Sequence, residues 1–338
     1  MANKRLKASV IIPAYNAEKT LSNCLQALLQ QSTSKDEYEI IVIDDGSTDK
    51  TVEVATDWGV KVISQPKLGP AIARNNGAMG ANGDILLFID SDCTADYHWL
   101  EEMLQPFSDF NIAGAQGNYK TKQNELIARF AQIEIEDRYN IMRKYKYIDF
   151  IGTYAAGYRK DIFIKMGMFD NSFPIASGED TDFSYRLSQC GYKMVFNPKA
   201  IVYHKHPSTL KSYLKQKYWR AYWRNLAYKK SKKKTLQDTY TPQILKLQIL
   251  LILLILLTIF FLPWLGKIVW YEISLLLLIF FASTIPFAYF AAKNDLLVSI
   301  LSPVLIFIRS LIFLLGISSG FANEIILRKL RSHKVNMD

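Results

Sequence analysis

Two long stretches without a charged residue, 247–266 and 273–292, most constrain what this 338-residue chain can fold into. Each is 20 residues long, and an apolar helix of about 20 residues crosses the ~30 Å hydrocarbon core of a bilayer. Basic clusters border the region, "KKSKKK" at 229–234 and "RKLRSHK" at 328–334. Such runs beside apolar segments are typical of juxtamembrane anchors. We therefore predict a C-terminal membrane region and a multi-pass protein of the cell membrane.

A third apolar stretch, 296–326, differs because Arg309 divides it. A central arginine is costly in lipid, so we expect this stretch to be re-entrant or interfacial. Three conventional spans are the alternative, with Arg309 paired inside the bundle. The positive-inside rule places both basic ends in the cytosol and requires an even number of crossings. The N-terminus lacks the apolar stretch of a signal peptide, so the preceding domain is also expected in the cytosol.

The overall charge adds little to this picture. The chain has 41 Lys and Arg against 31 Asp and Glu, and much of the excess lies in the two basic clusters. No recognisable nucleic-acid motif accompanies them, so nucleic acid is not an expected partner. The cysteines Cys24, Cys93 and Cys190 are widely spaced and fit a reducing compartment.

Residues 8 to about 120 alternate short apolar runs with helical patterns. The runs at 9–13, 38–44, 60–64 and 84–90 read as strands. Between them, "AEKTLSNCLQALLQQS" places Leu21, Leu25 and Leu28 on one helical face, and "GPAIARNNGAMGANG" begins a helix near Pro70. This alternation predicts an α/β fold with a mostly parallel sheet that is covered on both faces.

Polar clusters follow three of these strands: "PAYN", "DDGSTD" and "DSD". In open α/β sheets the ligand crevice lies at the carboxyl ends of the strands, so the clusters should converge on one site. Asp90 and Asp92 project to the same side of an extended strand and repel each other unless a cation, a proton or hydrogen-bond donors intervene. Hard oxygen ligands of this kind suit Mg²⁺ or Mn²⁺ together with substrate phosphates. A solvated turn or helix cap is the simpler alternative.

Four motifs in order, "SVIIPAYNAEKTL", "IIVIDDGSTDKT", "ARNNGAMGANGDILLFIDSD" and "GEDTDFSYRL", make the chain resemble family 2 glycosyltransferases over about residues 8–225. The resemblance implies the GT-A fold, a Rossmann-like α/β architecture. The membrane tail resembles the polysaccharide and lipid-linked glycan branch, including succinoglycan-type transferases. The expected organisation is a GT-A domain at 1–225, a basic juxtamembrane linker at 226–243, a transmembrane region at 244–327 and a basic cytosolic tail at 328–338.

The resemblance also implies a role for each matching residue. Asp45, with Asp44 second, would bind the nucleobase, and His204 would be a metal ligand or diphosphate contact, with a structural histidine as the alternative. The expected metal ligands are Asp90, Asp92 and His204. The "GEDTDF" segment matches the family's catalytic Glu-Asp pair, so Asp180 would be the general base with Glu179 beside it. The residues expected to contact the nucleotide sugar are Pro13, Ala14, Tyr15, Asn16, Asp44, Asp45, Arg74, Asp90, Ser91 and Gly157.

The implied activity is inverting, metal-dependent transfer of a sugar from a nucleotide-diphosphate sugar. The implied partners are that donor, membrane lipids and a lipid-linked saccharide or growing polysaccharide. Transfer to a polyprenyl phosphate, as in dolichol-phosphate-mannose synthases, is one alternative. A non-catalytic lipid-glycan binding protein on the same scaffold is another, although the intact acids argue against it. The segment "QKYWRAYWR" lacks the Gln-x-x-Arg-Trp order of processive synthases and reads as a helix at the membrane surface.

Overall fold

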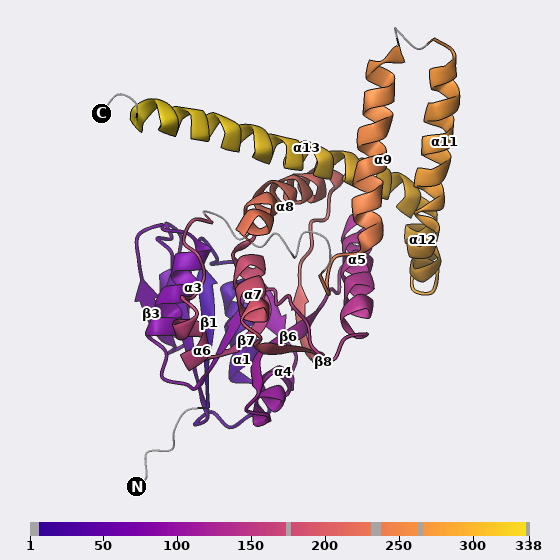
Figure 1. Cartoon of the computed structure of the whole chain (residues 1–338). Helices are drawn as coiled ribbons and strands as arrows, with labels where there is room; N and C mark the ends of the chain where they lie inside the picture. The colour runs from indigo at the N-terminus through magenta and orange to yellow at the C-terminus, as the bar shows by residue number, and fades with distance from the viewer. Residues whose placement is uncertain (1–6, 174–176, 231–237, 263–265, 336–338) are drawn as a thin grey trace. The chain divides into compact units, whose positions relative to one another are not determined.

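The computed structural model describes residues 7–173, 177–230, 238–262 and 266–335 (Figure 1). The chain divides into two compact units. The α/β unit comprises Met1–Gln123, Tyr139–His206 and Lys230–Tyr240, and the helical unit comprises Asn124–Arg138, Pro207–Lys229 and Thr241–Asp338. Parts of the predicted linker (231–237) and tail (336–338) lie outside the described residues, and the predicted boundaries between domains stay predictions.

The described strands of the α/β unit form one eight-stranded sheet, in the order β3-β2-β1-β4-β7-β6-β8-β5. Neighbours β1–β2, β1–β4, β2–β3 and β6–β8 are parallel, whereas β7 is antiparallel to β4 and β6, and β5 to β8. The predicted α/β class with a mostly parallel sheet is confirmed. The strands are β1 (Ala8–Ala14), β2 (Tyr38–Asp44), β3 (Lys61–Ser64), β4 (Ile85–Ile89), β5 (Cys93–Ala95), β6 (Ile112–Lys120), β7 (Ala155–Arg159) and β8 (Lys193–His204).

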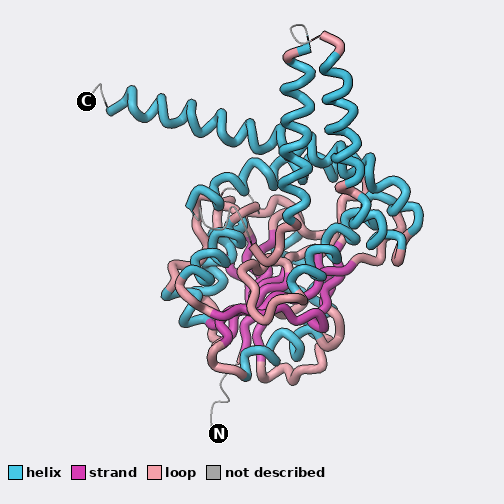
Figure 2. The backbone as a smooth tube through the Cα atoms, turned by 45° about the vertical axis from the view of Figure 1, so that its right-hand side comes forward, coloured by secondary structure: helices cyan, strands magenta, loops and turns pink. Residues whose placement is uncertain are grey.

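Helices cover both faces of this sheet (Figure 2), as the continuous apolar runs of β1, β2 and β4 require. Helix α1 buries Leu21, Leu25 and Leu28, the three leucines expected on one face. In α3, Gly77 permits close approach to β1, since a Cβ there would lie 2.4 Å from a methyl of Ile11. The helices of this unit are α1 (Leu21–Leu29), α2 (Thr51–Asp57), α3 (Pro70–Met79), α4 (Trp99–Leu104), α6 (Lys160–Lys165) and α7 (Glu179–Gln189), with a short 3₁₀ helix at Gln105–Ser108.

An aromatic cluster fixes α7 against the middle of the sheet. Phe88 on β4 meets Phe169 with ring centroids 5.5 Å apart, and Phe169 meets Phe183 on α7 at 5.4 Å. All three side chains are fully buried. Since Asp90 follows Phe88 closely and Glu179 precedes Phe183 by one helical turn, this packing brings the end of β4 and the start of α7 together.

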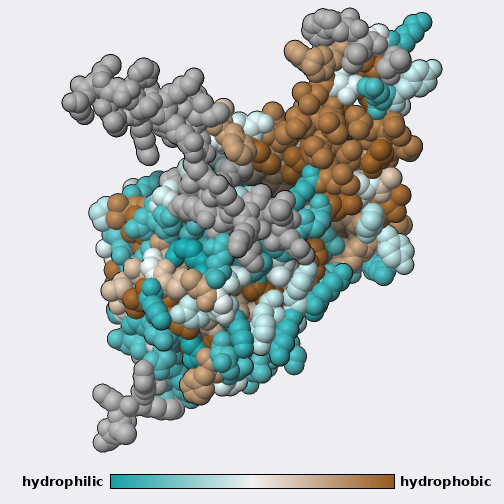
Figure 3. Space-filling model, viewed as in Figure 1, coloured by the Kyte–Doolittle hydropathy of each residue, from teal (hydrophilic) through white to brown (hydrophobic). Residues whose placement is uncertain are grey.

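The helical unit contains α8 (Leu210–Lys230), α9 (Gln243–Phe260), α11 (Ile268–Ala282), α12 (Ile285–Ala292) and α13 (Leu296–Val335), together with the first part of α5 (Leu126–Met142). Its core includes Phe130 of α5, Tyr213 of α8, Ile252 of α9, Phe280 of α11 and Ile306 of α13. Three helical segments are long and apolar enough to cross a membrane: Gln243–Phe260, Val269–Ala292 and Leu296–Asn323. Figure 3 shows apolar surface gathered over α9 and α11.

The turn between α3 and β4 supplies a test of how tightly the sheet is packed. A Cβ on Gly83 would lie 2.3 Å from the carbonyl carbon of Ala8 and 2.6 Å from the nitrogen of Ser9, both backbone atoms of β1. We expect Gly83→Ala to lower the free energy of unfolding by about 1–3 kcal/mol, the usual cost of overpacking. Gly80→Ala is the matched control, because its Cβ would meet only the terminal methyl of Ile63 at 2.9 Å. Equal thermal unfolding midpoints for the two variants would contradict this packing argument.

Candidate functional site

The loops after β1 and β2 are joined at the carboxyl edge of the sheet. The amide nitrogen of Asn16 donates to Ser47 Oγ (2.9 Å), and Asn16 Oδ1 accepts from the amide of Thr48 (2.9 Å). Asn16 has a positive φ of 49°, which asparagine tolerates better than most residues. Tyr15 beside it is 42 % exposed, with the Lys67 ammonium 3.9 Å from the centre of its ring. The predicted convergence of "PAYN" and "DDGSTD" is therefore present.

Asp45 organises the loop that leads into α3. Its carboxylate accepts hydrogen bonds from Gln65 Nε2 (2.7 Å) and from the amides of Leu68 (2.8 Å) and Gly69 (2.9 Å). Asp44 Oδ1 accepts from the amide of Ser47 at 3.1 Å. Both side chains are buried. These hydrogen bonds show that Asp45 holds the loop before α3 in place. Its binding of a nucleobase stays a prediction.

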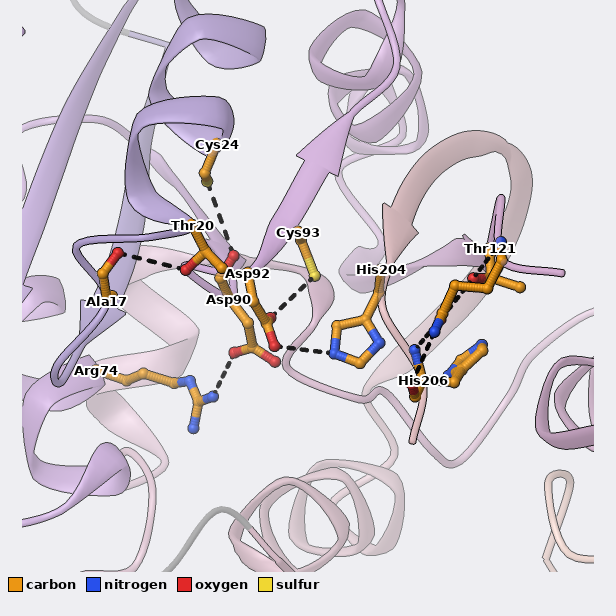
Figure 4. A network of polar contacts seen from close by, with 11 residues as sticks. Ala17, Thr20, Cys24, Arg74, Asp90, Asp92, Cys93, Thr121, His204 and His206 are labelled. Carbon is orange, nitrogen blue, oxygen red and sulfur yellow. Dashed lines mark hydrogen bonds and ion pairs between the residues drawn. The ribbon is translucent and has the colours of Figure 1, made fainter. Parts of the chain in front are cut away.

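Arg74 connects the acids after β4 to the acids at the start of α7. Its guanidinium lies 2.7 Å from Asp90 Oδ1 and 2.9 Å from Glu179 Oε1, and only 2 % of the side chain is exposed (Figure 4 shows the Asp90 pair). Residues 74, 90 and 179 come from α3, the β4 end and α7, so one cation joins three elements. Asp90 remains 32 % exposed and presents its carboxylate to solvent on the other side.

Glu179 and Asp180, the predicted catalytic pair, have different surroundings. Glu179 is buried, and burial together with Asp180 raises its pKa to about 7 against the opposing effect of Arg74. Among the residues that the structure describes, none donates a hydrogen bond to Glu179 Oε2. Asp180 is only partly buried, and its Oδ1 accepts from the amide of Thr181 at 2.6 Å. Asp180 is therefore the more accessible carboxylate of the two.

Asp92 faces His204 across the other side of the site. Asp92 Oδ2 lies 3.0 Å from His204 Nε2, and Figure 4 shows both beside Asp90. Burial would raise the pKa of the Asp92 carboxyl, but the contacts with His204, together with hydrogen bonds from a backbone amide and Cys93, outweigh it and lower the pKa. Among the described residues no group of three or more His, Cys, Asp or Glu side chains is arranged to hold a metal ion. The carboxylates of Asp90 and Asp92 are of the chemical kind that suits Mg²⁺ or Mn²⁺ beside phosphate oxygens, and His204 lies next to Asp92; that these residues hold a cation stays a prediction.

His204 lies at one end of a row of aromatic side chains that the sequence analysis missed. The Tyr119 ring stacks on the His204 ring, with their centroids 4.6 Å apart. Tyr119 also contacts Tyr154, and the centroids of these two rings are 4.2 Å apart. Tyr154 and Tyr139 join their hydroxyl groups at 2.9 Å. The sequence signal that could have identified Tyr119 is the polar end of the segment "IAGAQGNYK". Tyr119 lies near the end of β6, where this strand pairs with the last part of β8.

Two buried thiols lie under the acids. Cys24 Sγ is 3.8 Å from the carbonyl oxygen of Asp90, and Cys93 Sγ is 3.8 Å from Asp92 Oδ1 (Figure 4). Burial raises the pKa of both thiols, and the neighbouring carboxylates raise it further.

The remaining predicted residues lie in the sheet or its turns. Pro13 and Ala14 end β1, and Ser91 lies in the turn between Asp90 and Asp92. Gly157 is inside β7, opposite Leu87. A Cβ there would be 3.0 Å from both a Leu87 methyl and the Phe107 ring, so core packing by itself favours a glycine at this position.

The Arg74 link predicts unequal effects for two variants of Glu179. Glu179→Ala leaves the buried Arg74 with one carboxylate, and we expect the free energy of unfolding to fall by about 3 kcal/mol, as for other broken buried pairs. Glu179→Gln keeps an oxygen that accepts from Arg74, so its loss should be roughly half as large. Thermal unfolding of the full chain in detergent compares them. Two equally stable variants would show that Arg74 does not depend on this oxygen.

Comparison with known proteins agrees with this arrangement. Residues 9–167 match the sequence model of the family described as Glycosyl transferase family 2. The chain is 29 % identical over 200 residues to "Glycosyltransferase AglE" of Haloferax volcanii, covering 56 % of this chain and 63 % of that protein. It is 29 % identical over 235 residues to "Probable glycosyltransferase YdaM" of Bacillus subtilis, covering 64 % and 53 %. The matches thus span less than two thirds of either relative.

A third relative and one solved structure extend the comparison. The "Dolichyl N-acetyl-alpha-D-glucosaminyl phosphate 3-beta-D-2,3-diacetamido-2,3-dideoxy-beta-D-glucuronosyltransferase" of Methanococcus voltae is 25 % identical over 225 residues, 62 % of this chain and 70 % of that protein. The mannosyltransferase PcManGT of Pyrobaculum calidifontis shares the fold with a TM-score of 0.60 at 15 % identity, covering 94 % of this chain and 87 % of that one. Strand ends, acids and fold agree with these findings: residues 9–167 match a family 2 glycosyltransferase domain, and the sheet has a GT-A-like α/β fold.

Proposed function

We propose that the protein is an inverting, metal-dependent glycosyltransferase. It would move a sugar from a nucleotide-diphosphate sugar to a lipid-linked saccharide or growing polysaccharide at the cytosolic face of the membrane. One observation carries the proposal: Arg74 joins the Asp90 side of the site to the Glu179–Asp180 side. Acids suited to a diphosphate-bound cation and an acid suited to proton removal therefore belong to one polar network.

The acids at the start of α7 and the acids after β4 would have different catalytic roles. Asp180, half-exposed at the start of α7, would take the proton of the acceptor hydroxyl as its oxygen attacks the anomeric carbon. Asp92 and Asp90, with His204, would hold Mg²⁺ or Mn²⁺, which when bound offsets the charge that develops on the diphosphate. A single displacement of this kind requires no covalent enzyme intermediate. Tyr15, Asn16, Asp44 and Asp45 would form the pocket for the nucleoside.

The comparisons support the substrate classes without identifying them. PcManGT was solved in complex with GDP-Man and Mn²⁺, which is consistent with a diphosphate donor and a divalent cation here. The name of the Methanococcus voltae relative describes transfer to a dolichyl-linked sugar phosphate. Together with the apolar helices of the helical unit, this favours a lipid-linked acceptor.

The activity can be tested directly. The purified full chain would be incubated with UDP-, GDP- and dTDP-sugars, Mn²⁺ or Mg²⁺, and a membrane lipid extract. We expect a new glycolipid with one donor and no product when EDTA is present. If no donor is consumed although the protein binds a nucleotide sugar, the non-catalytic alternative replaces the proposal.

The metal assignment predicts a loss of cation dependence. We expect Asp92→Asn to abolish the increase in donor affinity that Mn²⁺ produces, while the thermal unfolding midpoint is retained because the side chain is 45 % exposed. Asp57→Asn, at the exposed end of α2, is the control. Calorimetry of nucleotide-sugar binding with and without Mn²⁺ measures both. An unchanged metal effect in Asp92→Asn would remove this residue from the cation site.

The general-base assignment predicts a defect in turnover alone. We expect Asp180→Asn to keep the donor dissociation constant near the wild-type value and to lower kcat by ~10²–10⁴-fold, the usual span for losing an acid or base. A polyprenyl phosphate acceptor is already ionised and depends less on a base. A much smaller loss with that acceptor than with a lipid-linked saccharide would therefore favour the alternative substrate. Wild-type turnover with every acceptor would exclude Asp180 from the mechanism.

A further inference from the structure

The last helix of the chain, α13, passes every simple criterion for a membrane span, since Leu296–Asn323 is long and apolar enough. Within the helical unit its apolar side chains pack against α9, α11 and α12, and it also makes ion pairs and a close backbone contact with two charged helices, α5 and α8. We propose that α13 lies in the plane of the membrane interface, on the side of its partners α5 and α8, and that the hairpin formed by α9 and α11 is the part that crosses.

The contacts of α13 with α5 come first along the chain. Asp295, just before α13, pairs with Arg129 of α5 at 3.0 Å, and Arg309 pairs with Glu134 of α5. Asp295 and Arg309 are separated by about 21 Å of helix rise. The part of α5 in this unit carries Arg129, Glu134, Glu136, Asp137 and Arg138. Such a segment does not enter hydrocarbon, so both ends of this length of α13 lie at polar depth.

The contacts with α8 continue the same line. A Cβ on Gly316 would lie 2.5 Å from the carbonyl oxygen of Tyr218, so the two backbones touch, and Asn323 Nδ2 donates to the hydroxyl of Tyr222. Helix α8 carries the cations Lys211, Lys215, Lys217, Arg220 and Arg224. Between Asp295 and Asn323, a length of about 42 Å, the helix therefore contacts α5 and α8 repeatedly. A spanning helix would have to leave them and cross ~30 Å of hydrocarbon.

The two faces of α13 fit this position. Asp295, Arg309, Gly316 and Asn323 are separated by 14, 7 and 7 residues, and residues seven apart differ by only about 20° around an α-helix. They therefore share one face. The exposed apolar side chains Leu297, Ile300, Val304 and Leu315 lie roughly 120–180° from it. One face of α13 therefore packs on the protein and includes the contacts with α5 and α8, and the exposed apolar face is available to lie against the acyl chains at the interface.

Arg309 is neutralised by the protein. Glu134 accepts from Arg309, from Lys217 Nζ (2.8 Å) and from Tyr213 Oη (2.6 Å). Burial would raise the pKa of Glu134, but Lys217 and Arg309 outweigh it and hold the pKa well below its usual range. Gln248 Oε1 accepts the second Arg309 donor at 2.9 Å. The arginine that divides the apolar stretch is thus a link between helices.

The polar contacts around Arg309 and Gln248 also mark the base of the hairpin formed by α9 and α11. Gln248 of α9 also donates to Ser283 Oγ, just after α11, at 3.2 Å. Beyond this level α9 exposes Leu250, Leu253 and Leu257, and α11 exposes Leu278 and Leu275. The helical rise is about 20 Å from Gln248 to Phe261 and about 24 Å from Ser283 to Lys267. Both lengths are shorter than the ~30 Å hydrocarbon core. Local thinning of the bilayer and snorkelling of Lys267 would compensate for this mismatch. Figures 1 and 2 both show α13 running across α9 and α11.

Cysteine labelling tests the proposal whichever way the protein is oriented. In a Cys190→Ser background the remaining thiols, Cys24 and Cys93, are buried. Single cysteines would be placed at Lys267 in the hairpin, at Met337 in the C-terminal tail and at Lys199 in the α/β unit, and treated with a membrane-impermeant maleimide before and after permeabilisation. We expect Met337→Cys to react on the same side as Lys199→Cys, and Lys267→Cys on the opposite side. Met337→Cys and Lys199→Cys on opposite sides, or Lys267→Cys on their side, would overturn the proposal.

Nitroxide depth measurements give a second, independent readout. Spin labels at Ile300 and Leu315 are about 22 Å apart along α13, yet an interfacial helix holds them at similar, shallow depths, as judged by collision with oxygen and with a water-soluble nickel complex. A label at Leu254 of α9, which is exposed in the hairpin, should be deeper than both. Depths for Ile300 and Leu315 that differ by more than about 10 Å would show that α13 crosses. Because neither readout uses transferase activity, failure of this proposal is distinguishable from failure of the proposed function.

Discussion

The site depends on one buried cation. Arg74 comes from α3, and without it the carboxylates of Asp90 and Glu179 would meet at the sheet edge with no positive charge between them. Like charges at such distances drive protonation or separation. The phenylalanines below, Phe88, Phe169 and Phe183, hold α7 against β4 by apolar packing, and Arg74 makes that packing compatible with acids at both element ends. Hydrophobic packing fixes the distance between the end of β4 and the start of α7. The ion pairs of Arg74 then allow two carboxylates to lie that close together.

The helical unit solves a similar problem with the signs reversed. There Arg309 enters an apolar helix, and Glu134 neutralises it while also satisfying Lys217 and Tyr213. A buried charge of this kind is costly unless it is paired and hydrogen-bonded. The pairing makes α5, α8 and α13 interdependent, because removing Glu134 leaves two cations in one buried place. In both units, therefore, one ionised side chain is shared by several elements.

Much of the fold was predictable because its signals are local. The apolar runs that became β1, β2 and β4 and the leucine face of α1 need only periodicity and burial. The meeting of the strand ends was predictable from the geometry of parallel sheets. Long-range partners were not. Arg74 and Glu179 are 105 residues apart in the sequence, and Arg309 and Glu134 are 175 residues apart. The residues around one partner therefore do not predict which residue will be the other partner. The stacking of Tyr119 on His204 is of the same kind. Gly157 has a packing explanation that the sequence did not show, since a Cβ there would crowd Leu87 and Phe107, and its contact with the nucleotide sugar stays a prediction.

The buried thiols under Asp90 and Asp92 have a consequence for the choice of metal. Burial and the adjacent carboxylates raise the pKa of Cys24 and Cys93, so both sulfurs stay protonated at neutral pH. A thiol is a poor ligand compared with a thiolate, and soft ions such as Cu⁺ owe much of their affinity to thiolate sulfur. The same carboxylates that would attract a hard cation thus withhold sulfur from a soft one. A cation held by these carboxylates would therefore meet two protonated sulfurs and no thiolate.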